Sequence, residues 1–257
     1  GEGCSKNIIA YYKFDYSYRD VCNGYNAIND GIENDLESSK GISGGGFAVQ
    51  LLVYSAKLRV PGLNGYTWGS QFSVSLWFKY AESRGLINNG KNDASWEIRI
   101  INKPIPRLIF RNTTVVMHLI PFIRASIVTT NNSSKTWDVA MVHYNRWHHI
   151  VMTYDGETVK FYLNNRLVKN DMECCRGNIM TRQNDVVIGD GGRPSSVHII
   201  DEVFLLKKAL TADQVRKLYQ TLTFDETTAI SSSSSLHSVS FLIAIVFLAC
   251  TFLNIPN

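Results

Sequence analysis

The amino-acid sequence predicts an all-β protein, a two-sheet antiparallel jelly-roll sandwich with one short C-terminal helix, followed by a hydrophobic tail. Three observations predict this class. The composition is 45% hydrophobic and 19% charged, which is enough for a packed core. Aromatic residues are abundant, with 12 Tyr, 12 Phe and 5 Trp against 6 Pro, and such side chains favour strands. Short apolar or alternating runs recur along the chain, with turn residues between them.

The predicted strands are the runs that alternate in polarity or are apolar throughout. Asp155-Gly156 and Asn164-Asn165 are good hairpin turns, because these residues tolerate positive φ. Pro104 and Pro106 should interrupt the alternation between two of the runs. The predicted strands are Ile8–Phe14, Phe47–Val53, Phe72–Lys79, Trp96–Ile101, Arg107–Phe110, Val115–Ile120, Trp147–Tyr154, Val159–Leu163, Val186–Ile188 and Val197–Leu206.

One convincing helix is predicted, over Ala212–Gln220. Thr211 can cap it and Gln214 stands at the capping-box position, while Val215 and Leu218 give it an apolar face. The helix should close the folded domain. We therefore expect a domain over 1–222, a Ser/Thr-rich linker and anchor-signal spacer over 223–240, and a hydrophobic tail over 241–257.

The C-terminal segment Ser231–Asn257 contains no Asp, Glu, Lys or Arg. Its apolar run is shorter than the ~20 residues of a spanning helix, and no basic residue follows it. Small residues, a polar spacer and a terminal apolar run together form a glycosylphosphatidylinositol signal. The sequence therefore predicts lipid attachment at Ser231, Ser232 or Ser233 and removal of the tail. The alternative is an ordinary short membrane anchor.

Cysteine usage also indicates an oxidising compartment. With Cys250 in the tail, the remaining Cys4, Cys22, Cys174 and Cys175 predict two disulfides, for which three connectivities are possible. A bridge between the neighbours Cys174 and Cys175 would be strained, so we expect each of them to bond elsewhere.

Glycosylation tripeptides point to the same compartment, and they begin at Asn112, Asn131 and Asn132. We expect the protein at the extracellular face of the plasma membrane. The net charge, 26 − 22 = +4, is too mild to indicate nucleic acid as a partner.

Four blocks of sequence, in a fixed order, resemble laminin-G-like domains of the concanavalin A-like lectin/glucanase superfamily. The resemblance covers roughly 8–222. It implies a non-catalytic cell-surface recognition or adhesion module whose ligand is carbohydrate, including sulfated glycans, or protein. In it, the mid-strand His149 is a packing residue rather than a catalytic base. The blocks are Ile9–Asp15 with Asp20–Ala27, Phe72–Phe78, Trp147–Asn165, and Ile199–Val203 followed by the helix to Tyr219.

The resemblance also implies a structural calcium ion at the rim of the sandwich. Its ligands would be Asp20 and Asn23 from the first loop and Asp201 from the closing strand, because calcium needs several hard oxygens at once. The chain departs from the family at Val53-Tyr54-Ser55, where related domains often carry Phe-Asp-Gly. Asp201 has a second interpretation, as a residue that only caps or hydrogen-bonds the rim.

A basic stretch without any acidic residue lies between Ile98 and Trp137. Arg99 and Lys103 share parity and can project from one face of a strand. With Arg107 and Arg111 they are candidates for binding sulfated glycans, because clustered cations attract polyanions. The competing interpretation is a solvated outer face beside a glycosylated loop.

An acidic spacing, Glu33-x-Asp35-x-Glu37, gives the alternative function, a glycan-active hydrolase of the same superfamily. Retaining β-glucanases use this spacing, because alternation places the three carboxylates on one strand face. Here the flanking residues are polar, so we expect a solvated acidic loop and no enzyme.

Overall fold

The computed structural model describes residues 4–30, 34–42, 46–51, 56–80, 85–90, 93–109, 114–131, 133–190, 198–224 and 226. Residues 34–39, 107–109 and 114–116 are described by their backbone alone. The chain divides into two units, Gly1–Phe224 and Asp225–Asn257, and all helices and strands of the described residues lie in the first.

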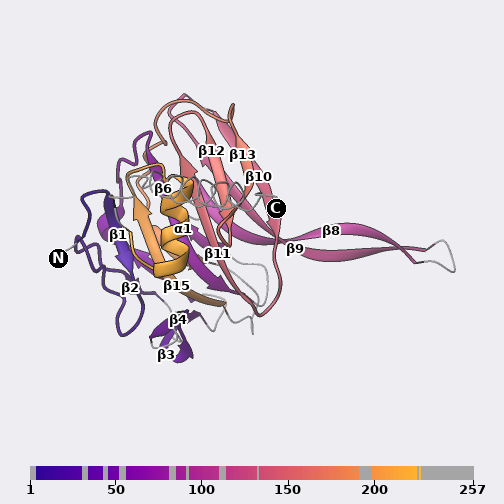
Figure 1. Ribbon diagram of the computed structural model, residues 1–257, viewed down its shortest axis with the longest axis horizontal. Helices are drawn as coiled ribbons and strands as arrows, with labels where there is room; N and C mark the ends of the chain where they lie inside the picture. The colour runs from indigo at the N-terminus through magenta and orange to yellow at the C-terminus, as the bar shows by residue number, and fades with distance from the viewer. Residues whose placement is uncertain are drawn as a thin grey trace, which may run out of the picture. The chain divides into compact units, whose positions relative to one another are not determined.

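Two antiparallel sheets form the first unit (Figure 1). Sheet A has the order β13-β12-β11-β6-β15-β4-β3, with β1 also paired to β15, and sheet B has the order β10-β9-β8-β7-β14-β5-β2. The predicted all-β fold class is confirmed. Sheet A contains β1 (Ile8–Tyr12), β3 (Asn34–Lys40), β4 (Phe47–Leu51), β6 (Phe72–Lys79), β11 (Trp147–Tyr154), β12 (Val159–Leu163), β13 (Arg166–Asp171) and β15 (His198–Leu206). Sheet B contains β2 (Ile28–Asn29), β5 (Leu58–Val60), β7 (Gly85–Asn88), β8 (Trp96–Ile109), β9 (Thr114–Val128), β10 (Ser134–Met141) and β14 (Val186–Asp190).

The main core lies between the sheets and follows the predicted alternation of β6. Phe72, Val74, Leu76 and Phe78 are fully buried in one cluster with Trp96 of β8. Burying such a side chain stabilises the fold by roughly 1.5–3 kcal/mol relative to leaving it exposed. The spacing of apolar residues in β6 therefore fixes which face of sheet A turns inward.

The opposite face of β6 is buried as well. Ser73, Ser75 and Trp77 are at most 7% exposed, because the chain returns over this face after β15. The Ser73 hydroxyl donates to Lys208 O at 2.6 Å and accepts from Leu210 N at 3.1 Å. Sheet A is therefore covered on both sides.

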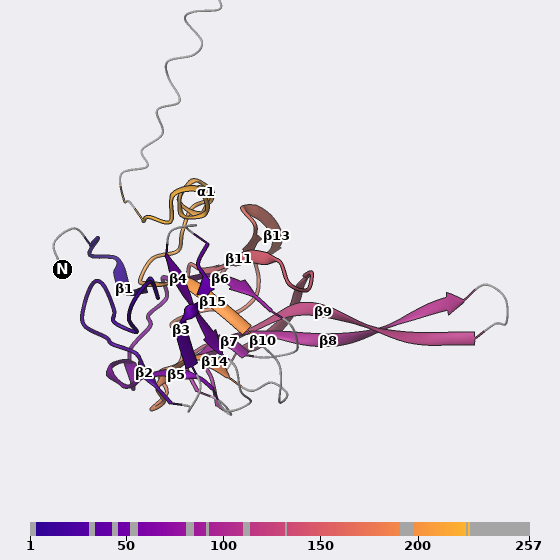
Figure 2. The same cartoon turned by 90° about the horizontal axis from the view of Figure 1, so that it is seen from below.

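Helix α1 (Ala212–Thr221) lies against this outer face, as Figure 2 shows. Its predicted capping box is present: Thr211 Oγ1 accepts from Gln214 N, and Gln214 Oε1 accepts from Thr211 N. Val215 and Leu218 enter a second apolar cluster, which also includes Phe204 of β15. A 3₁₀ turn, η1 (Pro61–Leu63), follows β5 on the other sheet.

His149 is packed beneath α1, as expected of a structural residue. It is 1% exposed, and its ring lies 5.0 Å from that of Trp77 and 5.8 Å from that of Tyr219. Its Nε2 is 2.8 Å from Ser75 Oγ, and burial lowers the pKa of the imidazole to about 3. This Ser–His pair has no access to a substrate, because Ser75 is 1% exposed.

Asp20 organises the loop that follows β1. Its Oδ1 accepts from the backbone N–H groups of Tyr11 and Cys22, and its Oδ2 accepts from those of Asn23 and Tyr25. The four distances are 2.9, 2.9, 2.9 and 3.0 Å. Hydrogen bonds to a charged acceptor contribute about 1.5–3 kcal/mol each. One carboxylate thus fastens the loop to β1.

Replacing Asp20 should destabilise the protein whether or not calcium is present. In Asp20→Asn an NH₂ group faces backbone donors, so we expect the free energy of unfolding to fall by about 2–4 kcal/mol. Urea denaturation measures this loss. Asp213→Asn, at an exposed position in the first turn of α1, is the matched control and should change stability by less than about 1 kcal/mol. Equal stability of the two variants would contradict the role of Asp20.

His149 should make the protein sensitive to acid. In the unfolded chain His149 takes up a proton near pH 6.5, whereas in the folded chain its pKa is lowered to about 3. Between these values the unfolded state holds more protons, so stability rises with pH across this window. Urea denaturation from pH 4 to pH 7 should give a flatter dependence for His149→Gln than for the wild type or for the exposed-site variant His118→Gln. An unchanged slope in His149→Gln would show that the imidazole is not buried neutral.

Candidate functional site

The acidic spacing lies partly on a strand rather than in the loop that we expected. Glu33 is outside the described residues, whereas Asp35 and Glu37 belong to β3, whose backbone pairs with β4 at the edge of sheet A. The loop prediction is wrong at these two residues, because β3 pairs antiparallel with the next strand, β4, although its own sequence is polar. The register with β4 shifts between Asp35 and Ser39, which breaks the regular alternation around Glu37. Three carboxylates on one face require that alternation.

The calcium candidates have other partners. A carboxylate offers about four acceptor positions, and four backbone donors already occupy those of Asp20. The side-chain amide of Asn23 donates to Ile8 O at 2.7 Å and Ile9 O at 3.0 Å. In the part of the chain that the structure describes, no group of three or more His, Cys, Asp or Glu side chains could hold a metal. These residues therefore do not fit the expected arrangement, and calcium binding stays a prediction.

Asp201 hydrogen-bonds the rim, in line with its second interpretation. Its Oδ2 accepts from Ile42 N at 2.9 Å, and its Oδ1 accepts from Glu202 N at 3.0 Å. Gly41 lies so close that an added Cβ would stand 2.7 Å from Asp201 Oδ2. Asp201 thus ties the turn before β4 to the closing strand β15.

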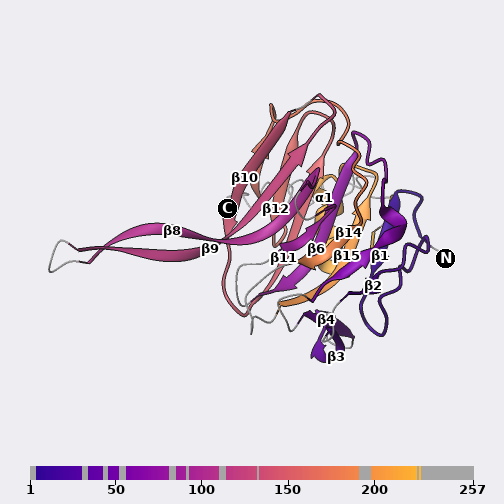
Figure 3. The ribbon, with the colours of Figure 1, turned by 180° about the vertical axis from the view of Figure 1, so that it is seen from behind.

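The basic stretch forms a long hairpin of β8 and β9 that extends beyond the edge of the two sheets (Figures 2 and 3). We call it the arm. β8 does not stop at Ile101, so the interruption that we expected at the two prolines is wrong. Pro104 pairs with Leu119 and Pro106 with Met117.

The two prolines are tolerated because of where the neighbouring strand ends. The pairing of β7 with β8 reaches Arg99, and beyond that residue β9 is the described partner of β8. Pro104 and Pro106 share parity, so their missing N–H groups can both lie on the unpaired edge, where no ladder bond is lost. Arg107 therefore falls on the same face of β8 as Arg99 and Lys103.

The basic side chains at the base of the arm are partly neutralised. Lys103 Nζ lies 3.0 Å from Asp138 Oδ2, and Arg124 Nη2 lies 2.8 Å from Asp138 Oδ1. The hydrogen bond from Arg124, followed by that from Lys103, lowers the pKa of Asp138. Arg99 makes a longer ion pair of 3.7 Å with Glu97. All three cations stay 41–47% exposed, as expected for a solvated cationic face.

The outer part of the arm is two-faced. The backbone register places Arg107 opposite Val116, while Arg111 lies outside the described residues. On the other face, Met117 and Leu119 are 55% and 58% exposed. The arm thus carries its cations on one face, where they alternate with apolar residues such as Ile101, Ile105 and Ile120, while the other face is mostly apolar.

A second candidate site surrounds an irregularity in β15. The first part of β15 pairs with β4 through Ile200, and the part after it pairs with β1 from Val203 onward. Its register with β6 shifts between Asp201 and Phe204, and Glu202 has a φ of 50°. Positive φ is rare outside glycine and tends to mark functional or strained positions. We call this segment the β15 bulge.

Glu202 is almost completely buried at this bulge. It is 4% exposed, and its Oε2 accepts a short hydrogen bond from the Tyr11 hydroxyl. Burial raises the pKa of Glu202 to about 7 and that of Asp201 to about 8, while burial and the neighbouring Glu202 raise that of Tyr11.

A cavity of about 470 Å³ opens beside the bulge. Its lining is polar and apolar in similar measure, and the rings of Tyr11 and Phe204 stack there at 3.8 Å. Lys13, Asp15 and Glu202 supply the charged groups of the lining. Sequence reasoning missed this site, although Tyr11 and Lys13 share parity in the first block and Glu202 follows a predicted ligand.

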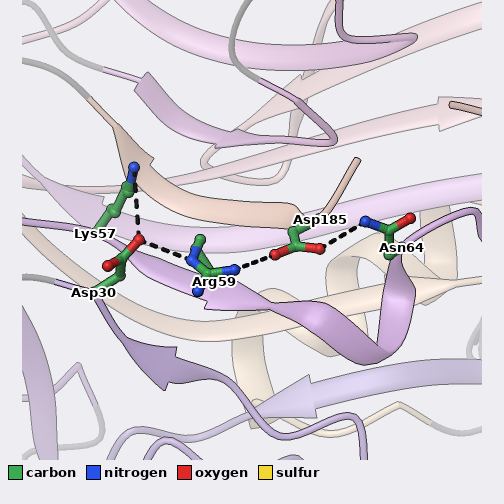
Figure 4. Close-up of polar contacts among 5 residues, drawn as sticks. All are labelled: Asp30, Lys57, Arg59, Asn64 and Asp185. Atoms are coloured by element: carbon green, nitrogen blue, oxygen red, sulfur yellow. Dashed lines mark hydrogen bonds and ion pairs between the residues drawn. The ribbon is translucent and has the colours of Figure 1, made fainter. Parts of the chain in front are cut away.

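A third polar cluster lies on sheet B, where β5 meets β2 and β14 (Figure 4). Arg59 binds Asp30 through Nε at 2.8 Å and Asp185 through Nη1 at 2.5 Å. Lys57 adds a 3.7 Å ion pair with Asp30, and Asn64 donates to Asp185 at 2.9 Å. Each carboxylate has a cationic partner, so the cluster is a connection between strands.

The disulfides differ from one expectation. Cys4 bonds Cys22, with a Cα–Cα distance of 5.6 Å, and Cys174 bonds Cys175. The prediction that Cys174 and Cys175 each bond elsewhere is wrong, because Cys4 and Cys22 satisfy each other.

Several predicted modification sites lie outside the described residues. Asn112, Asn132 and the attachment serines Ser231, Ser232 and Ser233 are among them. Asn131 is described and lies in the exposed turn between β9 and β10. Among the described residues, no helix is long and apolar enough to cross a membrane.

Solved structures share this fold at low identity. The binding domain of Paraclostridial Mosquitocidal Protein 1 matches with a TM-score of 0.62 and 14% identity, over 84% of this chain and 52% of that one. The Botulinum Neurotoxin serotype G binding domain matches with a TM-score of 0.58 and 16% identity, over 83% of this chain and 50% of that one. The chain thus spans about half the length of these toxin domains.

A third neighbour is matched over almost its whole length. It is domain 4 of AbnA, a GH43 extracellular arabinanase from Geobacillus stearothermophilus, solved in complex with arabinotriose. Its TM-score is 0.58 at 20% identity, over 83% of this chain and 98% of that one. No curated protein matches the chain. Residues 54–216, more than half of the chain, match the family model Laminin_G_3, and the protein therefore belongs to the concanavalin A-like lectin/glucanases superfamily.

Proposed function

We propose that the protein is a non-catalytic recognition module of the cell surface that binds acidic carbohydrate along the cationic face of the arm. The observation that carries the proposal is the arm itself. It extends β8 and β9 beyond the sheets and has cationic residues on one face, where a linear ligand can reach them.

The spacing of the cations supports a linear polyanion. Arg99, Lys103 and Arg107 follow one another at four-residue intervals on β8, which corresponds to roughly 14 Å per step. Arg124 of β9 stands opposite Arg99 and adds a second charge at the base. Because the side chains at the base stay more than 40% exposed, a sulfated or carboxylated chain can exchange with their carboxylate partners.

The comparisons support a carbohydrate as ligand. The arabinanase domain, which this chain covers almost completely, was solved with an oligosaccharide bound, and the toxin domains are described as binding domains. Each of these facts concerns another protein. For this chain they favour recognition over catalysis, and the broken alternation in β3 argues against the hydrolase alternative.

A protein ligand is the second candidate. The exposed apolar face of the arm, which includes Met117 and Leu119, favours it, since exposed apolar patches often mark protein contacts. A module that binds protein through this face would retain its ligand when the cationic face is neutralised. The same variants therefore separate the two candidates.

Neutralising the arm should weaken binding of a sulfated polysaccharide. We expect the triple variant Arg99→Gln, Lys103→Gln, Arg107→Gln to lose about tenfold or more in affinity for heparin, since each exposed ion pair contributes up to about 1 kcal/mol. Surface plasmon resonance at physiological salt measures the affinity. Desulfated heparin should bind weakly, and added salt should weaken binding of the sulfated form.

The matched control removes the same charge elsewhere. Arg166→Gln, Lys207→Gln, Arg216→Gln neutralises three exposed cations outside the arm and should retain wild-type affinity. Equal losses of heparin affinity in both triple variants would show that binding depends on the net charge of the protein and not on the arm. Absence of heparin binding by the wild-type protein would overturn the proposed ligand.

We also propose that a glycosylphosphatidylinositol anchor holds the module at the cell surface. The uncharged run from Ser231 to Asn257 supports this, with small residues at its start and apolar residues at its end. When the full-length chain is expressed in cells, phosphatidylinositol-specific phospholipase C should release the protein from their surface, and the released form should lack an epitope placed after Asn257. Protein that resists the enzyme and keeps the epitope would establish a membrane-spanning anchor instead.

A further inference from the structure

We infer that the cavity beside the β15 bulge binds a small organic cation, an ammonium group carried by an apolar body. The cavity is lined by β1, by β15 and by the residues that follow α1, and the arm contributes nothing to its lining. The inference is therefore independent of the proposed glycan binding.

The size and walls of the cavity fit a small molecule. Its volume of about 470 Å³ lies in the range of ligand pockets, which is about 300–1,000 Å³. Ile8 and Val21 line it on the side of β1, and Leu222 and Phe224 line it after α1. The stacked pair of Tyr11 and Phe204 completes an apolar wall that can also face a cation.

The charges around Tyr11 are unbalanced. Asp15, Asp201 and Glu202 all interact electrostatically with it, whereas Lys13 is the cation placed over its ring, at 6.0 Å from the centroid. Lys13 also interacts with Glu202. Of these groups Lys13, Asp15 and Glu202 line the cavity, so two carboxyl groups face one ammonium group there, and a cationic ligand would balance the second carboxylate.

Glu202 offers the hydrogen-bond acceptor. Its Oε2 is used by Tyr11, and no hydrogen bond to its Oε1 is found from any described residue. The residue is 4% exposed yet lines the cavity, so a ligand inside would meet a carboxylate removed from bulk water. A charge-assisted hydrogen bond is stronger than a neutral one, and the bulge holds the carboxylate in place for it.

An organic cation fits better than a metal ion. Among the described residues no three acidic, His or Cys side chains converge as ligands, so a metal would lack the oxygens it requires. A bare ion would leave the apolar side chains of the lining without a contact, whereas the body of an amine can pack against them.

Three probes with one apolar body test the inference: 4-phenylbutylamine, 4-phenylbutanol and 4-phenylbutyrate. Isothermal titration calorimetry with the full-length protein should give the amine about tenfold tighter binding than the alcohol at pH 8. The anion should bind most weakly of the three.

Two variants locate the effect. Glu202→Gln should remove the preference for the amine, whereas Glu157→Gln, at a 66% exposed position on another turn, should keep it. If Glu202→Gln does not fold, the ranking of the three probes on the wild-type protein decides. Equal binding of amine and alcohol, a preference for the anion, or no binding of the amine would each overturn the inference.

Discussion

The burial of sheet A on both faces is the constraint on which the rest of the structure depends. Sheet B covers the inner side of β6, and the segment from Lys208 through α1 covers its outer side. As a result, Ser73, Ser75 and His149 are inaccessible, and the hydrogen bond between Ser75 and His149 is not open to a substrate. The two candidate sites lie elsewhere, on the arm and beside the β15 bulge.

Both candidate sites lie where a strand loses or changes its pairing partner. Beyond Arg99, β8 has no described partner except β9, so the pair leaves the sheet and becomes a free arm. At Asp201, β15 changes partner from β4 to β1, and the two adjacent carboxyls bind Ile42 N and the Tyr11 hydroxyl. A loss or change of strand partner thus accompanies both the exposed arm and the cavity beside the β15 bulge.

Local signals in the sequence predicted the parts of the fold that local contacts decide. The alternation of β6, the turn at Asn164-Asn165 with φ of 50° and 65°, and the capping box of α1 are all confirmed. The errors at Pro104 and at β3 arose because antiparallel pairing with the next strand extends a strand over residues that do not favour one by themselves. The error at Cys174 and Cys175 arose because Cys4 and Cys22 bond each other. Glu202 was missed because its importance depends on Tyr11, which is remote in the sequence.

Hydrogen–deuterium exchange of the full-length protein with and without heparin tests the central claim most directly, because it reports every backbone segment at once. We predict slower exchange along the described parts of β8 and β9 on binding, with β6, β11 and β15 protected equally in both states. Protection that appears instead at the β2–β5–β14 edge, with an unchanged arm, would contradict the account.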